Sequence, residues 1–151
     1  MRFPPPLIFA TGFLLGWILE VRVRSLPMAG APSTRAVLEV VGALGVVGGL
    51  VVAFWGLWTF HRAHTAILPH RPASRLVTSG PYRFSRNPMY VGLTAAYIGL
   101  AMLANTLWPP VFLPLVITAL YLLVVRREER YLGSAFGAEY AEYRRRIRRW
   151  L

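Results

Sequence analysis

Residues Ser79–Tyr90 read SGPYRFSRNPMY and mark the boundary between a polar, arginine-rich segment and a long apolar one. This stretch holds a Gly-Pro turn signal, an Asn-Pro break, two arginines and two tyrosines, and an apolar run begins at Met89. Clusters of Gly, Pro and Asn are typical of turns. A polar turn set directly against an apolar run is a candidate functional site, so what lies near it in space matters most.

The composition around this stretch indicates a membrane protein. The 151 residues are 56% hydrophobic, and long apolar runs account for much of that fraction. The net charge of +11 comes from arginines that gather at the ends of the apolar runs, which is typical of membrane topology and anionic lipid contact rather than of nucleic-acid binding. The absence of cysteine excludes disulfides, thiolate nucleophiles and cysteine metal sites.

We expect an all-α, polytopic membrane protein with about four transmembrane helices in a single domain, 1–151. Apolar runs cover residues 4–21, 36–60, 89–104 and 107–125. Two transmembrane helices would occupy 1–60, a cytosolic loop 61–88, a transmembrane hairpin 89–125 and an amphipathic tail 126–151. The first run could instead be a signal peptide cleaved near Ala29-Gly30-Ala31. Glu20 near the end of the run, and the two arginines between the run and those alanines, favour a retained helix.

Glycines four residues apart recur in the first two apolar runs, as Gly12/Gly16 and Gly45/Gly49. Small residues at this spacing let helix backbones approach closely. The pattern predicts that the first two helices pack against each other.

The third and fourth runs are separated only by Asn105 and Thr106, which predicts a helical hairpin. At 1.5 Å per residue, the outgoing helix rises roughly 23 Å and the returning one roughly 33 Å. The prolines early in the fourth run delay its start or kink it. The hairpin therefore brings Glu128 and Glu129 to about the depth of the Arg86–Tyr90 corner.

The tail is too charged to span a membrane, but one of its faces is apolar. That face holds Leu132, Phe136, Tyr140, Tyr143 and Ile147. The pattern predicts an amphipathic helix lying on an anionic membrane surface. Four spans put both termini and the 61–88 loop on one side, which then carries 14 of the 17 arginines and is predicted to be cytosolic.

The two adjacent glutamates are the main candidates for chemistry. Acids at a membrane boundary are costly unless they are paired or used. Glu128 and Glu129 could simply form salt bridges with neighbouring arginines, but the hairpin also places them at the Asn-Pro corner. The three histidines, His61, His64 and His70, have no Asp or Cys beside them, so we expect no metal site.

Taken together, the motifs resemble a known family. Leu76–Tyr82, then Arg86–Gly92, then Glu128-Glu129 and the residues through Tyr143, are similar to the isoprenylcysteine carboxyl methyltransferase and phospholipid methyltransferase superfamily. The resemblance covers roughly the second half of the chain and keeps its order across the hairpin. It implies an integral membrane enzyme that transfers a methyl group from S-adenosyl-L-methionine to a lipophilic small-molecule or lipid acceptor.

The resemblance also implies roles for particular residues. Residues before and at the turn would line the adenosine side, the Asn-Pro corner would touch the cofactor, and the two acids would hold its ammonium or hydroxyl groups. The implied cofactor-binding residues are Leu76, Val77, Tyr82, Asn87, Pro88, Met89, Tyr90, Glu128 and Glu129. For catalysis, Arg86 could orient an anionic group, and Tyr90 or Glu129 could remove a proton from the acceptor.

Two departures from the family pattern concern the acceptor. The isoprenylcysteine enzymes have a histidine where this chain has Asn87, which cannot titrate. A basic residue deeper in the fourth helix, before Arg126, is missing. Two alternatives stay open: a nicotinamide-dependent membrane reductase of related helical fold, and a non-enzymatic membrane scaffold.

Overall fold

The structure is a computed structural model that describes residues 4–63 and 75–151. These residues form helices joined by short connections, which confirms the expected all-α class. In chain order the elements are α1 (Pro5–Arg22), α2 (Pro32–Arg62), the 3-10 helix η1 (Gly80–Arg83), α3 (Pro88–Leu103), α4 (Trp108–Leu120), the π-helix η2 (Tyr121–Val125) and α5 (Arg126–Arg146).

Three of the helical stretches are long and apolar enough to cross a membrane: α1, α2 and the continuous stretch from Trp108 to Arg146. The shorter apolar helix α3 completes the four expected spans. A stripe of large apolar side chains along α2 is more than half exposed, as in Val37, Leu44 and Phe54 at 61%, 68% and 64%. So large an exposed apolar face is suited to lipid rather than water.

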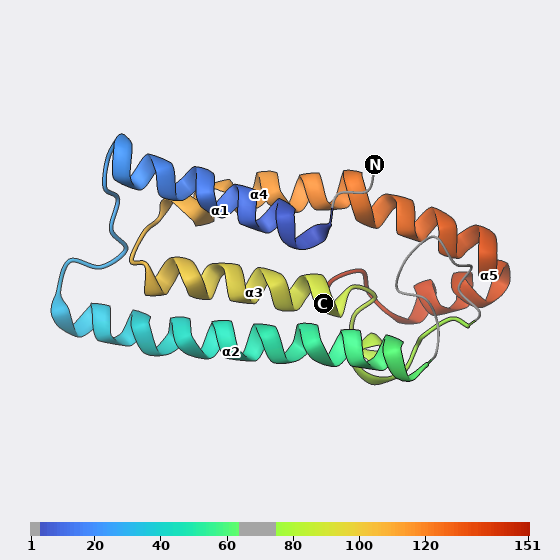
Figure 1. The fold of residues 1–151 in the computed structure, drawn as a ribbon. Helices are drawn as coiled ribbons and strands as arrows, with labels where there is room; N and C mark the ends of the chain where they lie inside the picture. The colour runs from blue at the N-terminus through green and yellow to red at the C-terminus, as the bar shows by residue number, and fades with distance from the viewer. Residues whose placement is uncertain (1–3, 64–74) are drawn as a thin grey trace.

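The helices form two adjacent pairs, with α1 along α4 and α2 along α3 (Figure 1). From α1 to α4, each helix runs in the direction opposite to the one before it. The α1–α2 and α3–α4 connections meet at one end of the bundle, whereas η1, the start of α3, α5 and the end of the chain meet at the other (Figure 1). The polar turn and the two acids therefore share one end.

The glycines spaced four residues apart in α1 and α2 do not face each other as we expected. Those of α1 face α4, and those of α2 face α3. A Cβ atom on Gly49 of α2 would lie 2.4 Å from the carbonyl oxygen of Gly92 in α3. On α1, a Cβ at Gly12 would lie 2.2 Å from Val116 Cγ2 of α4, and one at Gly16 would meet the backbone of Pro109. The prediction that the first two helices pack through these glycines was wrong, because glycine spacing marks a contact face without naming its partner.

Two neighbouring glycines of α2 test this packing. We expect Gly49→Ala to destabilise the protein by about 1–3 kcal/mol, because the added methyl group overlaps the α3 backbone. Gly48→Ala has nothing within 4 Å of its new Cβ, so it should be neutral or gain up to about 1 kcal/mol from helix propensity. Thermal unfolding of both variants in one detergent measures the difference. Equal stabilities would show that α2 does not pack on α3 as described.

The end of the bundle away from the acids is held together by side chains from the two connections. The Asn105 amide pairs with the backbone of Ala29 in both directions, at 2.9 and 3.0 Å. The fully buried Thr106 donates its hydroxyl hydrogen to Glu20 Oε2 at 2.7 Å, and the Leu26 amide donates to the same oxygen. These bonds tie the end of α1 and the α1–α2 connection to the α3–α4 turn.

Beyond the bundle, α4 continues through the π-helix η2 into α5, and α5 bends at Gly137, where φ is 46° and ψ is −115°. A positive φ of this kind suits glycine. The predicted apolar face does not lie free for a membrane surface. Its tyrosines Tyr140 and Tyr143 form a buried cluster with Leu76, and Leu132, Phe136 and Ile147 pack around them. The bend at Gly137 is the reason, because it folds the end of α5 back onto the turn region (Figure 1).

Candidate functional site

The two acids of α5 meet the start of α3 through direct contacts. The Tyr90 hydroxyl donates to Glu128, lying 2.9 Å from Oε1 and 3.1 Å from Oε2. Arg86 Nη1 donates to Glu129 Oε1 at 3.0 Å. The juxtaposition predicted from the length of the hairpin is therefore present, and the two neighbouring acids contact different groups.

Glu128 lies near a buried hydroxyl that is not satisfied. Tyr82 of η1 is 5% exposed, and its hydroxyl has no hydrogen-bond partner among the described residues. Burial, and after it the negative charge of Glu128, raises the pKa of Tyr82, so the hydroxyl stays protonated at neutral pH and can donate a hydrogen bond. An orphaned buried donor that feels the charge of a carboxylate is a natural place for a polar ligand group.

The side chain of Tyr82 is surrounded by residues of α2 and α3. A Cβ on Gly56 would lie 3.4 Å from the Tyr82 hydroxyl and 2.6 Å from Met89 Cγ, so only glycine leaves room there. The ring of Phe60 packs edge-on against Tyr82, with centroids 5.0 Å apart. The turn residue Tyr82 is thus held by the end of α2.

Glu129 is held by two arginines. Besides Arg86, Arg149 binds it through a two-pronged contact, with Nε 2.8 Å from Oε1 and Nη2 3.0 Å from Oε2. Side-chain exposure is 10% for Arg86, 14% for Glu129 and 33% for Arg149. The Arg149 guanidinium also lies 5.0 Å above the ring of Tyr121 in η2. Glu129 therefore joins three parts of the chain.

The Asn-Pro corner is organised by short-range bonds. Asn87 is the residue before α3, and Pro88 occupies the first turn, where its missing N–H costs nothing. The Asn87 side-chain amide donates to the carbonyl oxygen of Arg149 at 3.0 Å. The buried Ser85 hydroxyl accepts the Asn87 backbone N–H at 3.1 Å and donates to that same carbonyl at 3.3 Å. The amide of Asn87 thus holds the end of the chain.

The residues expected to line the adenosine side occupy a second layer. Leu76 and Val77 are both 7% exposed, and Leu76 packs on Tyr140 and Tyr143. The Tyr143 hydroxyl donates to the carbonyl oxygen of Tyr82 at 2.8 Å, which links this layer to the turn. Contact of Leu76 or Val77 with a cofactor stays a prediction.

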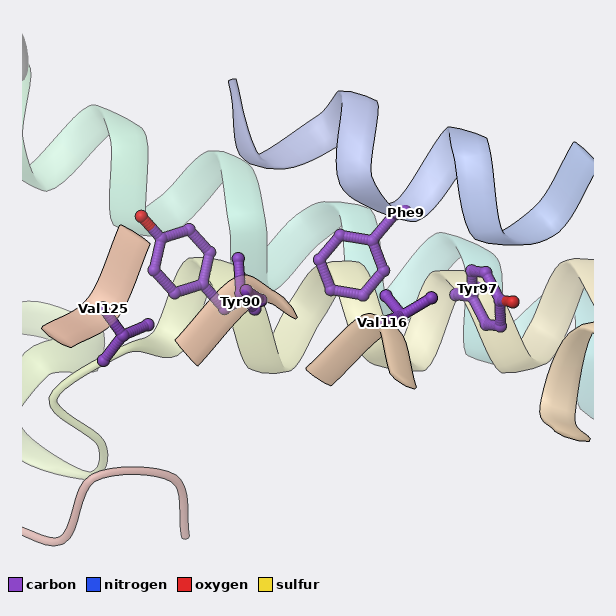
Figure 2. Packing of buried hydrophobic residues seen from close by; sticks show 6 residues of the cluster. Phe9, Tyr90, Tyr97, Val116 and Val125 are labelled. Carbon is purple, nitrogen blue, oxygen red and sulfur yellow. The ribbon is translucent and has the colours of Figure 1, made fainter. Parts of the chain in front are cut away.

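The site stands on the main core. Figure 2 shows Tyr90 and Val125 at one end of a row of buried side chains that continues through Phe9 and Val116 to Tyr97. These side chains come from α1, α3, α4 and η2. The Tyr90 ring is packed in this core while its hydroxyl reaches Glu128, so the position of the acid is coupled to rigid packing.

The sequence profile of the phospholipid methyltransferases matches residues 37–139, about two thirds of the chain. The chain belongs to the phospholipid methyltransferase family. The cobalt-zinc-cadmium resistance protein CzcN of Cupriavidus metallidurans is 36% identical over 103 residues, covering 68% of this chain and 45% of that protein. The protein-S-isoprenylcysteine O-methyltransferase of Schizosaccharomyces pombe is 35% identical over 72 residues, covering 48% and 30%.

A probable protein-S-isoprenylcysteine O-methyltransferase of Oryza sativa is 31% identical over 110 residues, covering 71% of this chain and 57% of that protein. The chain spans about half the length of the first of these relatives. No solved structure matches this family member. The recognised superfamily is thereby confirmed.

Metal chemistry has no visible support in the part of the family member that the structure describes. Residues 4–63 and 75–151 hold no group of three His, Asp or Glu side chains placed to bind a metal ion. His64 and His70 lie outside the described residues, so our expectation that the protein has no metal site stays a prediction.

The sequence analysis missed Ser85, Tyr121 and Arg149. Arg149 is one of five arginines between residues 144 and 149, and nothing in the sequence separates it from the others. The family match ends at residue 139, so it too gives no signal for the last residues of this family member.

Proposed function

We propose that this methyltransferase uses S-adenosylmethionine to methylate a lipophilic acceptor at the cytosolic face of the membrane. The observation that carries the proposal is the Glu128 carboxylate, held by the Tyr90 hydroxyl and close to the unsatisfied hydroxyl of Tyr82. Membership of the family supports methyl transfer as the reaction class. The methyl donor, the acceptor and the membrane side are our proposals.

The residues at the turn fit the proposed cofactor chemically. S-adenosylmethionine carries an ammonium group and ribose hydroxyls. These groups can donate hydrogen bonds to a carboxylate such as that of Glu128. It also carries acceptor atoms that the protonated Tyr82 hydroxyl can serve. When bound, it supplies a methyl group activated by the neighbouring sulfonium.

Methyl transfer from a sulfonium is a displacement that asks mainly for alignment and the exclusion of water. Tyr90 would keep Glu128 in place, and the core beneath Tyr90 would keep that pair rigid. A carboxylate acceptor needs no base, whereas an amine or phenol must lose a proton. For such acceptors Tyr90 and Glu129 stay the proposed bases, although in this structure the Tyr90 hydroxyl donates to Glu128 and Glu129 is paired with two arginines. Arg86 stays the proposed group for orienting an anion, although in this structure it is paired with Glu129.

The arginine distribution supports a cytosolic site. By sequence, the end of the bundle that is predicted to hold both termini and the 61–88 segment carries 14 of the 17 arginines. The positive-inside rule assigns such an end to the cytosol. A lipophilic acceptor would then arrive from the bilayer and the nucleotide cofactor from the cytosol.

The test uses the purified protein in detergent. Incubation with S-adenosylmethionine carrying a labelled methyl group and a total lipid extract should label a lipid-soluble species. A thermal-shift comparison separates the alternatives: S-adenosylhomocysteine stabilises a methyltransferase, NADPH stabilises a nicotinamide-dependent reductase, and neither stabilises a scaffold. Stabilisation by NADPH alone would reject the proposal.

Replacing Tyr82 with phenylalanine probes the orphaned hydroxyl. We expect Tyr82→Phe to leave stability unchanged or slightly higher, because it removes a buried group that has no partner among the described residues. Affinity for S-adenosylhomocysteine, measured by calorimetry, should fall about two- to tenfold with the loss of one hydrogen bond.

Tyr143→Phe is the matched control for this variant. It removes a hydroxyl that does have a partner, so it should lose about 0.5–1.5 kcal/mol of stability. If Tyr82→Phe lost stability and kept its affinity, the hydroxyl would have a structural role only.

A further inference from the structure

The last five residues, Ile147–Leu151, form a C-terminal strap that returns to the candidate site after α5 ends. The end of the chain lies beside the start of α3 (Figure 1). Trp150 packs against the main hydrophobic core, and this contact holds the strap against the bundle. The residue before it, Arg149, is the one whose side chain reaches Glu129.

The backbone of the strap also forms hydrogen bonds with the turn. The Arg86 backbone N–H donates to the carbonyl oxygen of Arg148 at 2.9 Å. The carbonyl oxygen of Arg149 accepts from both Asn87 and Ser85, at 3.0 and 3.3 Å. The strap therefore satisfies the Arg86-Asn87 turn at the point where α3 begins.

The Arg149 side chain joins the same turn to α5 and η2. Its two-pronged bond to Glu129 fixes the orientation of that carboxylate, since a guanidinium and a carboxylate match in geometry as well as in charge. Its position over Tyr121 anchors it to the π-helix. Glu129 directly follows Glu128 in the chain, so holding Glu129 also limits where the Glu128 carboxylate can lie.

We infer that Arg149 is a positioning residue of the proposed cofactor site, which the strap carries to Glu129 and which acts through Glu129 to hold Glu128 against Tyr90. The inference rests on the proposed function for its ligand. The family match covers residues 37–139, so the strap lies outside the matched residues.

Arg148 offers a matched control one residue away. Its side chain is exposed, and only its backbone carbonyl contacts the turn, so Arg148→Ala removes the same charge and keeps the strap bonds. We expect Arg149→Ala to weaken S-adenosylhomocysteine binding about tenfold or more, which corresponds to losing a charged hydrogen-bonded pair. Arg149→Lys keeps the charge without the fork and should lie between the two. Arg148→Ala should bind like the wild type.

A second measurement needs no ligand. The amide hydrogen of Arg86 is held by the strap, so its exchange with solvent should be slow in the wild type and in Arg148→Ala, and faster in Arg149→Ala. If Arg149→Ala bound the ligand as tightly as the wild type, the positioning role would be rejected. Equal exchange in all three proteins would reject docking of the strap through Arg149. A wild type without affinity for the ligand would reject the proposed function, and the exchange result would then still decide the strap.

Discussion

Replacing Glu128 with alanine should reduce the affinity for S-adenosylhomocysteine by about tenfold or more, because it removes the charged group that we propose holds this ligand. The fold should survive. Glu128 is an exposed residue. The ring of Tyr90, whose hydroxyl contacts Glu128, is held by its packing in the core and does not need that contact. Isothermal titration calorimetry in detergent gives the affinity, and thermal unfolding gives the stability.

Glu139→Ala is the control for this prediction. Glu139 is an exposed acid on the same helix, so its removal changes the net charge equally. It should leave the affinity as it is in the wild type. Unchanged affinity in Glu128→Ala would show that Glu128 does not hold the cofactor, and the proposed function would lose its main support.

Glu129→Ala should differ from Glu128→Ala by strongly lowering the stability of the protein. We expect a loss of about 3 kcal/mol, because the change leaves two guanidinium groups near each other without their carboxylate. Leaving Arg86 unpaired costs more stability than leaving Arg149 unpaired. The Arg86 side chain is only 10% exposed, whereas that of Arg149 is 33% exposed and can reach water. Chemical or thermal unfolding in a single detergent measures the change.

The matched control is Glu142→Ala, which also removes a glutamate bound to two arginines. Glu142 and its partners Arg145 and Arg146 are 43% to 75% exposed, so their pairing should contribute less than about 1 kcal/mol. If the two variants lost equal stability, the Glu129 cluster would be an ordinary surface ion pair.

Much of this arrangement could be predicted from the chain. The apolar runs gave the helices, and the two-residue break at Asn105-Thr106 gave the hairpin. Because a helix has a constant rise per residue, counting residues was enough to bring Glu128 and Glu129 to the Arg86–Tyr90 corner. That geometry placed the two acids near the corner, but it did not decide that Glu128 would contact Tyr90 and Glu129 would contact Arg86.

The choice of partners could not be predicted in the same way. Gly12 and Gly49 were recognised as contact positions, but they face Val116 and Gly92 rather than each other. The amphipathic face of α5 was recognised too, but the bend at Gly137 turns it onto Leu76 instead of leaving it for a membrane surface. A local pattern shows which side of a helix is buried, and many surfaces could cover it.

The sequence by itself determined that the chain is helical, that it belongs in a membrane, and that an Asn-Pro corner meets a pair of acids. These follow from hydrophobicity, residue count and turn chemistry, which act along the chain. Only the tertiary structure divided the two acids, giving Glu129 to Arg86 and Arg149 and leaving Glu128 with Tyr90 near the hydroxyl of Tyr82. That division depends on where the last residues of the chain pack, and packing between distant segments is set by the shape of the whole molecule rather than by any one stretch of it.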